Sequence, residues 1–195
     1  MSATRPPLQL SVLDARRFTV VEGTNLGDPL GFADEVIPDD VYELAGDARP
    51  GRLAVETAEG SAFTVAEGSG LGRPGAALHL DSCLTLMGAD GVPAEALVLV
   101  ELDAEGFVAA VYLHPLARLL PRVPYTLVGI DRASARRRFA ELGCVSFSRG
   151  TRITLASGAQ VPIEALREGD RVLTRDDGAQ PVRWIGQSTL RATGA

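Results

Sequence analysis

An internal repeat with an offset of 45 residues is the feature that most constrains the fold of this chain. The segment Phe18-Thr-Val-Val-Glu-Gly-Thr-Asn-Leu-Gly-Asp-Pro29 recurs as Phe63-Thr-Val-Ala-Glu-Gly-Ser-Gly-Leu-Gly-Arg-Pro74, with eight of twelve positions identical. Two copies are too few for a solenoid, which needs about three units to bury a continuous core. We therefore expect the repeat units, about 8–47 and 53–90, to pack together as one domain, with Phe18 and Phe63 at equivalent buried positions.

The repeat units and the residues that follow them have the pattern of β-strands. Apolar runs of about 4 to 7 residues are bounded by Gly, Pro, Asp or Asn, and the shared Glu-Gly-[Thr/Ser]-x-Leu-Gly-x-Pro segment is typical of a turn. Further strands are expected at 96–102, 107–113 and 125–130, with a hairpin loop at 103–106. One helix is expected at Arg132–Leu142, with Asp131 as its N-cap and Gly143 as its end.

The charge changes sign after this helix, which indicates a domain boundary near 140–145. Residues 1–143 carry a net charge of -8, and residues 144–195 carry +2. We predict a mainly β protein with two domains. The first, 1–143, is a duplicated β-sandwich-like domain that ends in the short linker helix, and the second, 144–195, is a smaller β segment.

Composition excludes several classes of function. All 19 basic residues are Arg, so mechanisms that need a lysine amine are absent. Two Cys (Cys83 and Cys144) and two His are too few for a disulfide framework or a usual metal site, and we expect no metal and no cofactor. The net charge of -6 argues against nucleic-acid or anionic-membrane partners. The consecutive arginines 136–138 are expected to form a solvated helix face.

The start of the chain lacks the pattern of a secretory signal, and its apolar stretches are too short for a membrane helix. We therefore expect a soluble protein that is cytoplasmic or exported by a non-classical route.

The second domain contains several motifs in a characteristic order. A Ser or Cys is followed by an aromatic residue and Gly-Thr, then by V-P-I-E-A-L-R-E-G-D-R-V-L-T and D-D-G-A-Q-P-V-R-W-I-G, with turns expected at Gly158, Gly169 and Gly178. This order resembles the first half of a Hint domain, the autoprocessing module of inteins and Hedgehog-type proteins, in its bacterial form. The resemblance implies a partial β fold of a Hint module over 144–195.

The resemblance also implies a nucleophile and a reaction. The family pattern counts back from Gly150 to Ser146, whereas Cys144, two residues earlier, has the more reactive side chain at neutral pH. The substrate is the chain's own peptide bond, which an N-to-O or N-to-S acyl shift converts into an ester or thioester, leading to autoproteolysis or splicing.

One departure from the family pattern affects activity. A Hint domain needs a His from its second half, and no His follows position 144. We therefore expect that the second half is absent and that this chain is inactive. An alternative is a non-catalytic β-sandwich module for binding or surface display with a vestigial Hint segment. A conventional hydrolase using Ser with His114 or His79 has no Gly-x-Ser-x-Gly motif to support it.

Overall fold

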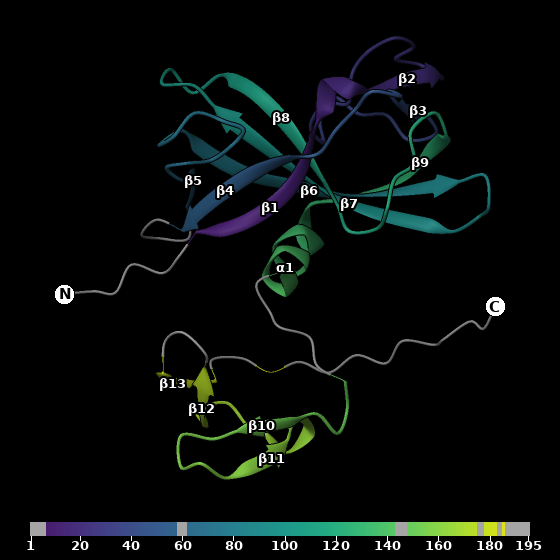
Figure 1. Cartoon of the computed structure of the whole chain (residues 1–195). Helices are drawn as coiled ribbons and strands as arrows, with labels where there is room; N and C mark the ends of the chain where they lie inside the picture. Colours follow the sequence, from purple (N-terminus) through teal and green to yellow (C-terminus); the bar gives the residue numbers. More distant parts are fainter. Residues whose placement is uncertain (1–6, 58–61, 143–147, 175–177, 183–184, 186–195) are drawn as a thin grey trace. The chain divides into compact units, whose positions relative to one another are not determined.

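The structure is a computed structural model that describes residues 7–57, 62–142, 148–174, 178–182 and 185. The chain divides into two compact units, Met1–Cys144 and Val145–Ala195. About half of the described residues of the first unit lie in β-strands, so the prediction of a mainly β fold is confirmed (Figure 1). In chain order this unit contains β1 (Leu8–Asp14), the 3-10 turn η1 (Ala15–Arg17), β2 (Phe18–Glu22), β3 (Val41–Leu44), β4 (Gly51–Thr57), β5 (Phe63–Val65), β6 (Ala77–Gly88), β7 (Pro93–Leu102), β8 (Val108–Pro115), β9 (Pro124–Asp131) and α1 (Arg132–Leu142).

Six of these strands close into a ring, which gives the sheet a barrel-like form. Antiparallel pairing runs from β6 through β5, β4, β1 and β8 to β7, and β7 pairs again with β6. The strands β9, β3 and β2 extend the sheet from residues 83–88 of β6. The expected sandwich-like packing is therefore replaced by one sheet folded on itself, an arrangement that pairs most strand edges within the unit.

The register between β1 and β4 has the symmetry of the duplication. Leu8 pairs with Val55, Gln9 with Ala54, and Leu10 with Leu53. Adding 45 to a residue number in β1 gives the equivalent residue of β4. Exchanging equivalent residues turns the Leu8–Val55 pair into the Leu10–Leu53 pair and leaves the Gln9–Ala54 pair unchanged. The equivalent strands of the two copies therefore pair around a local pseudo-two-fold axis that passes between Gln9 and Ala54.

Both glycines of the shared turn motif have positive φ in both copies. Its first glycine has φ +129° at Gly23 and +73° at Gly68, and its second has φ +90° at Gly27 and +76° at Gly72. Residues with a side chain rarely adopt these angles, which explains why Gly stands at both places. The turn predicted from the repeat is confirmed.

A buried carboxylate holds each of these turns. In the first copy, Asp40 is 1% exposed and accepts a hydrogen bond from the backbone N–H of Thr24 at 2.5 Å. In the second, Glu101 is 3% exposed and accepts from the N–H of Arg73 at 3.0 Å and from the Tyr112 hydroxyl at 2.7 Å. Buried acids of this kind are stable because hydrogen-bond donors compensate for the lost water.

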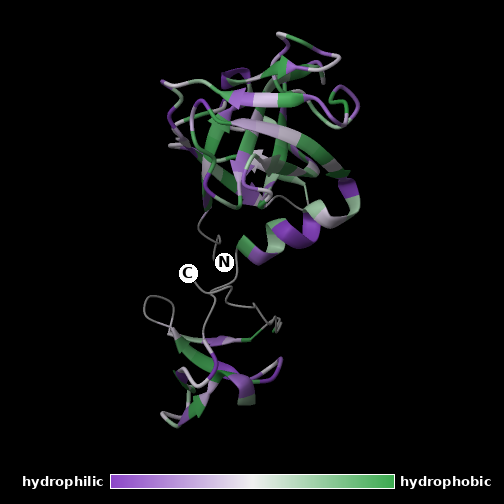
Figure 2. Cartoon of the chain, turned by 90° about the vertical axis from the view of Figure 1, so that its right-hand side faces the viewer, coloured by the Kyte–Doolittle hydropathy of each residue, from purple (hydrophilic) through white to green (hydrophobic). Residues whose placement is uncertain are grey.

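Strand β7 lies between two hydrophobic clusters. Val98 and Val100 belong to the cluster that contains Phe18, here called the Phe18 cluster. Leu97 and Leu99 belong to the one that contains Leu53, the Leu53 cluster. Because successive strand residues point to opposite faces, a strand with a core on each side is apolar without alternation. Figure 2 shows this concentration of hydrophobic residues in the strands of the first unit.

Phe18 and Phe63 are equivalent in the repeat but are not equally buried. Phe18 is 0% exposed, with its ring centroid 5.3 Å from that of Tyr42. Phe63 is half-buried at the edge of the Leu53 cluster, 4.8 Å from the ring of Phe139. The prediction of equivalent burial is wrong for Phe63. β3 and β9 extend the sheet beside Phe18, whereas Phe63 begins a strand of three residues.

Helix α1 begins and ends where the sequence predicts. Asp131 accepts hydrogen bonds at 2.8 and 2.9 Å from the backbone N–H groups two and three positions further on, the geometry of an N-cap. Ala135 and Phe139 are buried in the Leu53 cluster. Arg138 does not fit the expected solvated face, because its guanidinium lies 2.8 Å from the carboxylate of Glu95 on β7.

Within the described residues, no helix has the length and apolar character needed to cross a membrane.

Candidate functional site

The described part of the second unit consists of two small hairpins. The strands β10 (Arg152–Thr154) and β11 (Gln160–Pro162) pair antiparallel, and the 3-10 turn η3 (Ile163–Ala165) follows them. The strands β12 (Arg171–Thr174) and β13 (Gly178–Pro181) form the second pair. A bridge between Leu155 and Val172, and a hydrogen bond of 2.7 Å from the N–H of Ala156 to the Arg171 carbonyl, join the hairpins.

The glycine turns predicted for this segment are present. Gly158 has φ +85° and its N–H donates to the Leu155 carbonyl at 2.9 Å, closing the β10–β11 hairpin. Gly169 has φ +90° and its N–H donates to the Val182 carbonyl at 2.8 Å, which brings the start of β12 next to the end of β13. Gly178 has φ +63°. All three angles favour glycine.

The core of this unit is small. Among its described hydrophobic residues, Leu166 is buried, at 7% exposure. Four others are half-buried: Ile153, Leu155, Val161 and Ile163. A unit of about 50 residues buries little apolar area relative to its surface, so its hydrogen bonds and turns contribute a larger share of its organisation.

The two candidate nucleophiles, Ser146 and Cys144, lie outside the described residues. The described chain resumes at Ser148, immediately before a turn in which the N–H of Thr151 donates to the Ser148 carbonyl at 3.1 Å. Gly150 occupies the left-handed region in this turn, with φ +85°. The Gly of the Gly-Thr motif is therefore required by a tight turn that begins two residues after Ser146.

Glu164 fixes the position of this turn. Its Oε2 accepts a hydrogen bond from the backbone N–H of Gly150 at 2.8 Å, and its Oε1 lies 3.6 Å from Nε of Arg149. The hydrogen bond from Gly150 is the main reason that the pKa of Glu164 is lowered. One position earlier, the N–H of Ile163 donates to the Thr151 carbonyl at 2.8 Å. Together these contacts tie the segment after the candidate nucleophile to η3.

Sequence analysis did not assign a role to Glu164. The residue stands in the motif V-P-I-E-A-L, but no spacing rule links it to a glycine 14 positions earlier. Its oxygens contribute a hydrogen-bond acceptor and a negative charge, not a nucleophile. We therefore regard it as a positioning residue for the Ser148–Thr151 turn.

The two histidines, both in the first unit, have ordinary structural surroundings. His114 on β8 is half-buried, and its Nδ1 lies 2.8 Å from the carbonyl oxygen of Ser11. Burial lowers the pKa of His114, although the contact with Ser11 acts in the opposite direction. His79 lies at an exposed position on β6. In the part of the chain that the structure describes, neither histidine has a hydrogen bond to a serine side chain.

Metal-binding side chains do not gather in the described ranges. No group of three or more His, Cys, Asp or Glu residues there is arranged to hold an ion. Cys83 is a buried free thiol on β6, and burial raises its pKa, which is unfavourable for thiolate chemistry.

Comparison with known proteins gives one family match. No curated protein and no solved structure matches the chain. The family model of the Hint domain matches residues 145–195. This match, over the segment whose turns and Glu164 contact are described above, supports a Hint domain in the second unit of the chain.

Proposed function

We propose that residues 145–195 belong to an autoprocessing module that acts on the chain's own peptide bond. The observation that carries the proposal is the match of this segment to the Hint domain. The matched range includes Ser146 and begins one residue after Cys144, which supports Ser146 as the nucleophile.

The proposed first step is an N-to-O acyl shift. The Ser146 hydroxyl oxygen attacks the carbonyl carbon of Val145, the C–N bond between these residues breaks, and the hydroxyl proton is transferred to the released amine. An ester then joins the Val145 acyl group to Ser146. With Cys144 as nucleophile, the equivalent step gives a thioester with the acyl group of Gly143. A side-chain nucleophile of this kind divides one difficult acyl transfer into two easier steps.

Glu164 supports this reaction by holding the backbone near the nucleophile. The Gly150–Glu164 hydrogen bond ties the turn that begins two residues after Ser146 to η3. Restricting the backbone on one side of a reacting bond reduces the entropy that must be lost to reach the reactive geometry.

The acid for the leaving nitrogen is not supplied by the matched segment, because residues 144–195 contain no histidine. A serine hydroxyl at its ordinary pKa is a weak nucleophile without a partner base and donors for the developing oxyanion. We therefore propose that the 195-residue chain does not process itself.

Mass spectrometry after incubation with hydroxylamine at neutral pH tests the proposal. The 195-residue chain is expected to keep its mass, since no ester accumulates to be cleaved. A fusion protein in which a histidine-containing second half of a Hint domain is joined after Ala195 is expected to be cleaved before Ser146. Ser146→Ala should abolish this cleavage and Cys144→Ala should not. Cleavage of the 195-residue chain would contradict its proposed inactivity. Loss of cleavage only in Cys144→Ala would contradict Ser146 as the nucleophile.

We propose binding of a partner by the first unit as a second candidate function, because two consecutive large hydrophobic side chains are exposed there. Phe107 and Val108, at the start of β8, are 71% and 47% exposed. Such binding does not depend on whether the second unit is active.

A further inference from the structure

We infer that the first unit binds an extended polypeptide segment that carries a Lys or Arg side chain, at a pocket beside the open edge of β8. The inference is independent of the proposed Hint chemistry, because every residue involved lies in the first unit. It assigns a location and a ligand chemistry to the binding function named above.

The first observation is an open strand edge. β8 pairs with β7 from Val108 to Pro115, but on its other side it pairs with β1 only at Tyr112 and Leu113. Among the described residues, no strand pairs with this side of residues 108–111, because β1 ends at Asp14 and the chain turns into η1. An open edge presents backbone N–H and C=O groups that an extended peptide can pair with.

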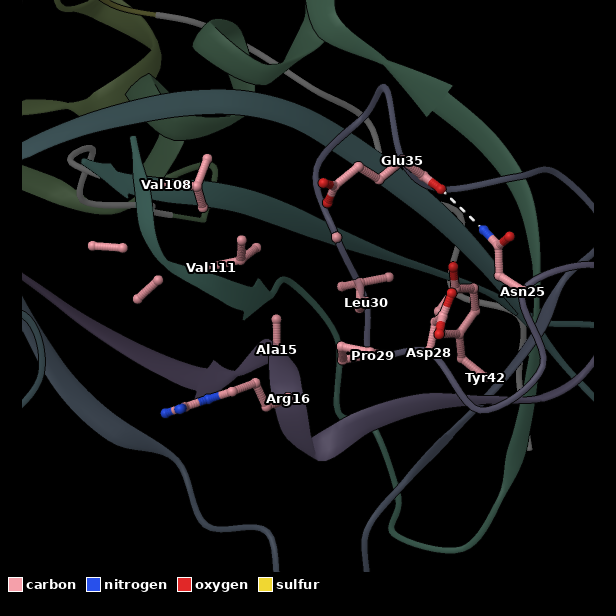
Figure 3. A pocket seen from close by; sticks show the side chains of 13 residues that line it. Ala15, Arg16, Asn25, Asp28, Pro29, Leu30, Glu35, Tyr42, Val108 and Val111 are labelled. Atoms are coloured by element: carbon pink, nitrogen blue, oxygen red, sulfur yellow. Dashed lines mark hydrogen bonds between the residues drawn. The ribbon is translucent and has the colours of Figure 1, made fainter. Parts of the chain in front are cut away.

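The second observation is a pocket that borders this edge. It has a volume of about 570 Å³ and is lined by the four consecutive residues 108–111, by η1 and by the loop after β2 (Figure 3). Side chains of successive strand residues point to opposite faces. Four consecutive lining residues therefore place the backbone edge of β8, and not one of its faces, against the pocket.

The third observation is the polarity of the pocket. Ala15, Pro29, Leu30 and Val111 give it apolar walls. The side chains of Asn25, Asp28 and Tyr42 lie together towards one end of the view, the carboxylate of Glu35 points towards the middle, and Arg16 extends from the other end (Figure 3). The combination suits a ligand group with an apolar stem and a polar tip, such as the side chain of Lys or Arg.

Three of these polar groups have no partner in the described protein. The carboxylates of Asp28 and Glu35, both at exposed positions, make no hydrogen bond or ion pair there, and neither does the hydroxyl of Tyr42, a residue that is 1% exposed. The Tyr42 hydroxyl is not among the fully buried unpartnered atoms of the described residues, so it faces the pocket, where a ligand group can replace water as its hydrogen-bond partner. Burial, with a contribution from the charges of Asp40 and Asp28, raises the pKa of Tyr42 to about 12, so the phenol stays protonated.

The charge balance of the pocket selects a cation. The Arg16 guanidinium is already paired with Asp14, with contacts from Nε at 3.0 Å and from Nη2 at 2.5 Å. The exposed carboxylates of Asp28 and Glu35 therefore have water, and no cation of the described residues, beside them. An ammonium or guanidinium group next to them would gain charge-assisted hydrogen bonds, which are stronger than neutral ones.

Isothermal titration calorimetry with a defined probe tests the inference. The probe is the pentapeptide Thr-Val-Lys-Val-Thr, acetylated at its N-terminus and amidated at its C-terminus. The control is the same peptide with norleucine in place of lysine. The lysine peptide is expected to bind about tenfold more tightly than the norleucine peptide, and the difference should shrink in high salt. Equal binding of the two peptides, or no binding of either at millimolar concentration, overturns the inference.

Variants locate the site. Asp28→Asn combined with Glu35→Gln is expected to weaken binding of the lysine peptide about tenfold, and Tyr42→Phe several-fold. None of these changes removes a hydrogen bond within the described protein, so thermal unfolding should be nearly unchanged. Glu67→Gln, at an exposed position outside the pocket, is the matched control and should bind normally.

A further pair of measurements tests the strand edge. The lysine peptide with N-methyl groups on its backbone is expected to lose binding, because it cannot pair with residues 108–111. n-Butylammonium alone should bind at least tenfold more weakly than the peptide. If the N-methylated peptide or the free amine binds as well as the original peptide, the pocket recognises an organic cation and the polypeptide part of the inference is wrong.

Discussion

The unequal burial of Phe18 and Phe63 predicts that the two copies of the repeat contribute unequally to stability. Phe18→Ala removes a ring that is 0% exposed and stacks 5.3 Å from Tyr42 and 6.2 Å from Tyr125. Truncation of a fully buried Phe costs about 3 to 5 kcal/mol, the sum of lost burial, a residual cavity and lost aromatic contacts. We expect a value in this range.

Phe63→Ala is expected to cost about half as much. The Phe63 ring is half-buried, and among the described residues its aromatic contact is with Phe139. Roughly half of the burial is lost, and the site opens to solvent instead of leaving a closed cavity, which gives about 1.5 to 2.5 kcal/mol. Phe107→Ala is the matched control, since this side chain is 71% exposed and its truncation should change stability by about 0.5 kcal/mol or less.

Urea unfolding followed by tyrosine fluorescence measures these values. All three tyrosines lie in the first unit, so in a Trp184→Phe background their emission reports the unfolding of this unit alone. With a urea dependence of about 2 kcal/mol per molar, the midpoints of the Phe18→Ala and Phe63→Ala proteins should differ by about 1 M. Equal midpoints for these two variants would refute the argument from burial.

Three further predictions concern polar groups. Burial lowers the pKa of His114 below its ordinary value of 6.5, so the unfolded chain takes up this proton more readily. Unfolding free energy should therefore fall as pH decreases from about 7 to about 5.5, and His114→Gln should remove this part of the dependence in urea titrations. Glu101→Ala should cost about 2 to 4 kcal/mol in the same assay, because the Tyr112 hydroxyl and a backbone N–H lose their acceptor. Glu164→Ala should raise the amide hydrogen exchange rate of Gly150, measured by NMR.

Each of these polar predictions has its own control. His79→Gln, at an exposed position, should leave the pH dependence in place. Tyr112→Phe should cost less than Glu101→Ala, since it removes one donor and leaves the carboxylate with its backbone partner. Gly158, which closes the neighbouring hairpin, should keep its exchange rate in Glu164→Ala. Unchanged exchange at Gly150 would mean that its contact with Glu164 does not persist in solution.

The sequence by itself determined the features that depend on neighbouring residues or on the duplication. The helix at Arg132–Leu142 follows from a capping Asp131 and helical spacing, and the turns at Gly158 and Gly169 follow from the need for positive φ. These backbone requirements depend on neighbouring residues alone, so they hold in whatever fold the segment occurs.

The likeness of the two copies is also readable from the sequence. The 45-residue offset is the symmetry of the β1–β4 pairing, because equivalent apolar positions on two equivalent strands bury the same face. The resemblance of the second unit to a Hint domain likewise rests on several motifs in a fixed order, and the family match covers residues 145–195.

Only the tertiary structure decided which equivalent residues differ and which distant residues meet. Phe18 is fully buried against Tyr42 and Tyr125, whereas Phe63 is half-buried at the edge of the Leu53 cluster, because different distant residues pack on the two equivalent rings. The contact of Glu164 with Gly150 and the unpaired hydroxyl of Tyr42 join segments with no shared local pattern. Such contacts depend on how the whole sheet closes, and the free energy that selects this closure is distributed over many residues, so no short motif records it.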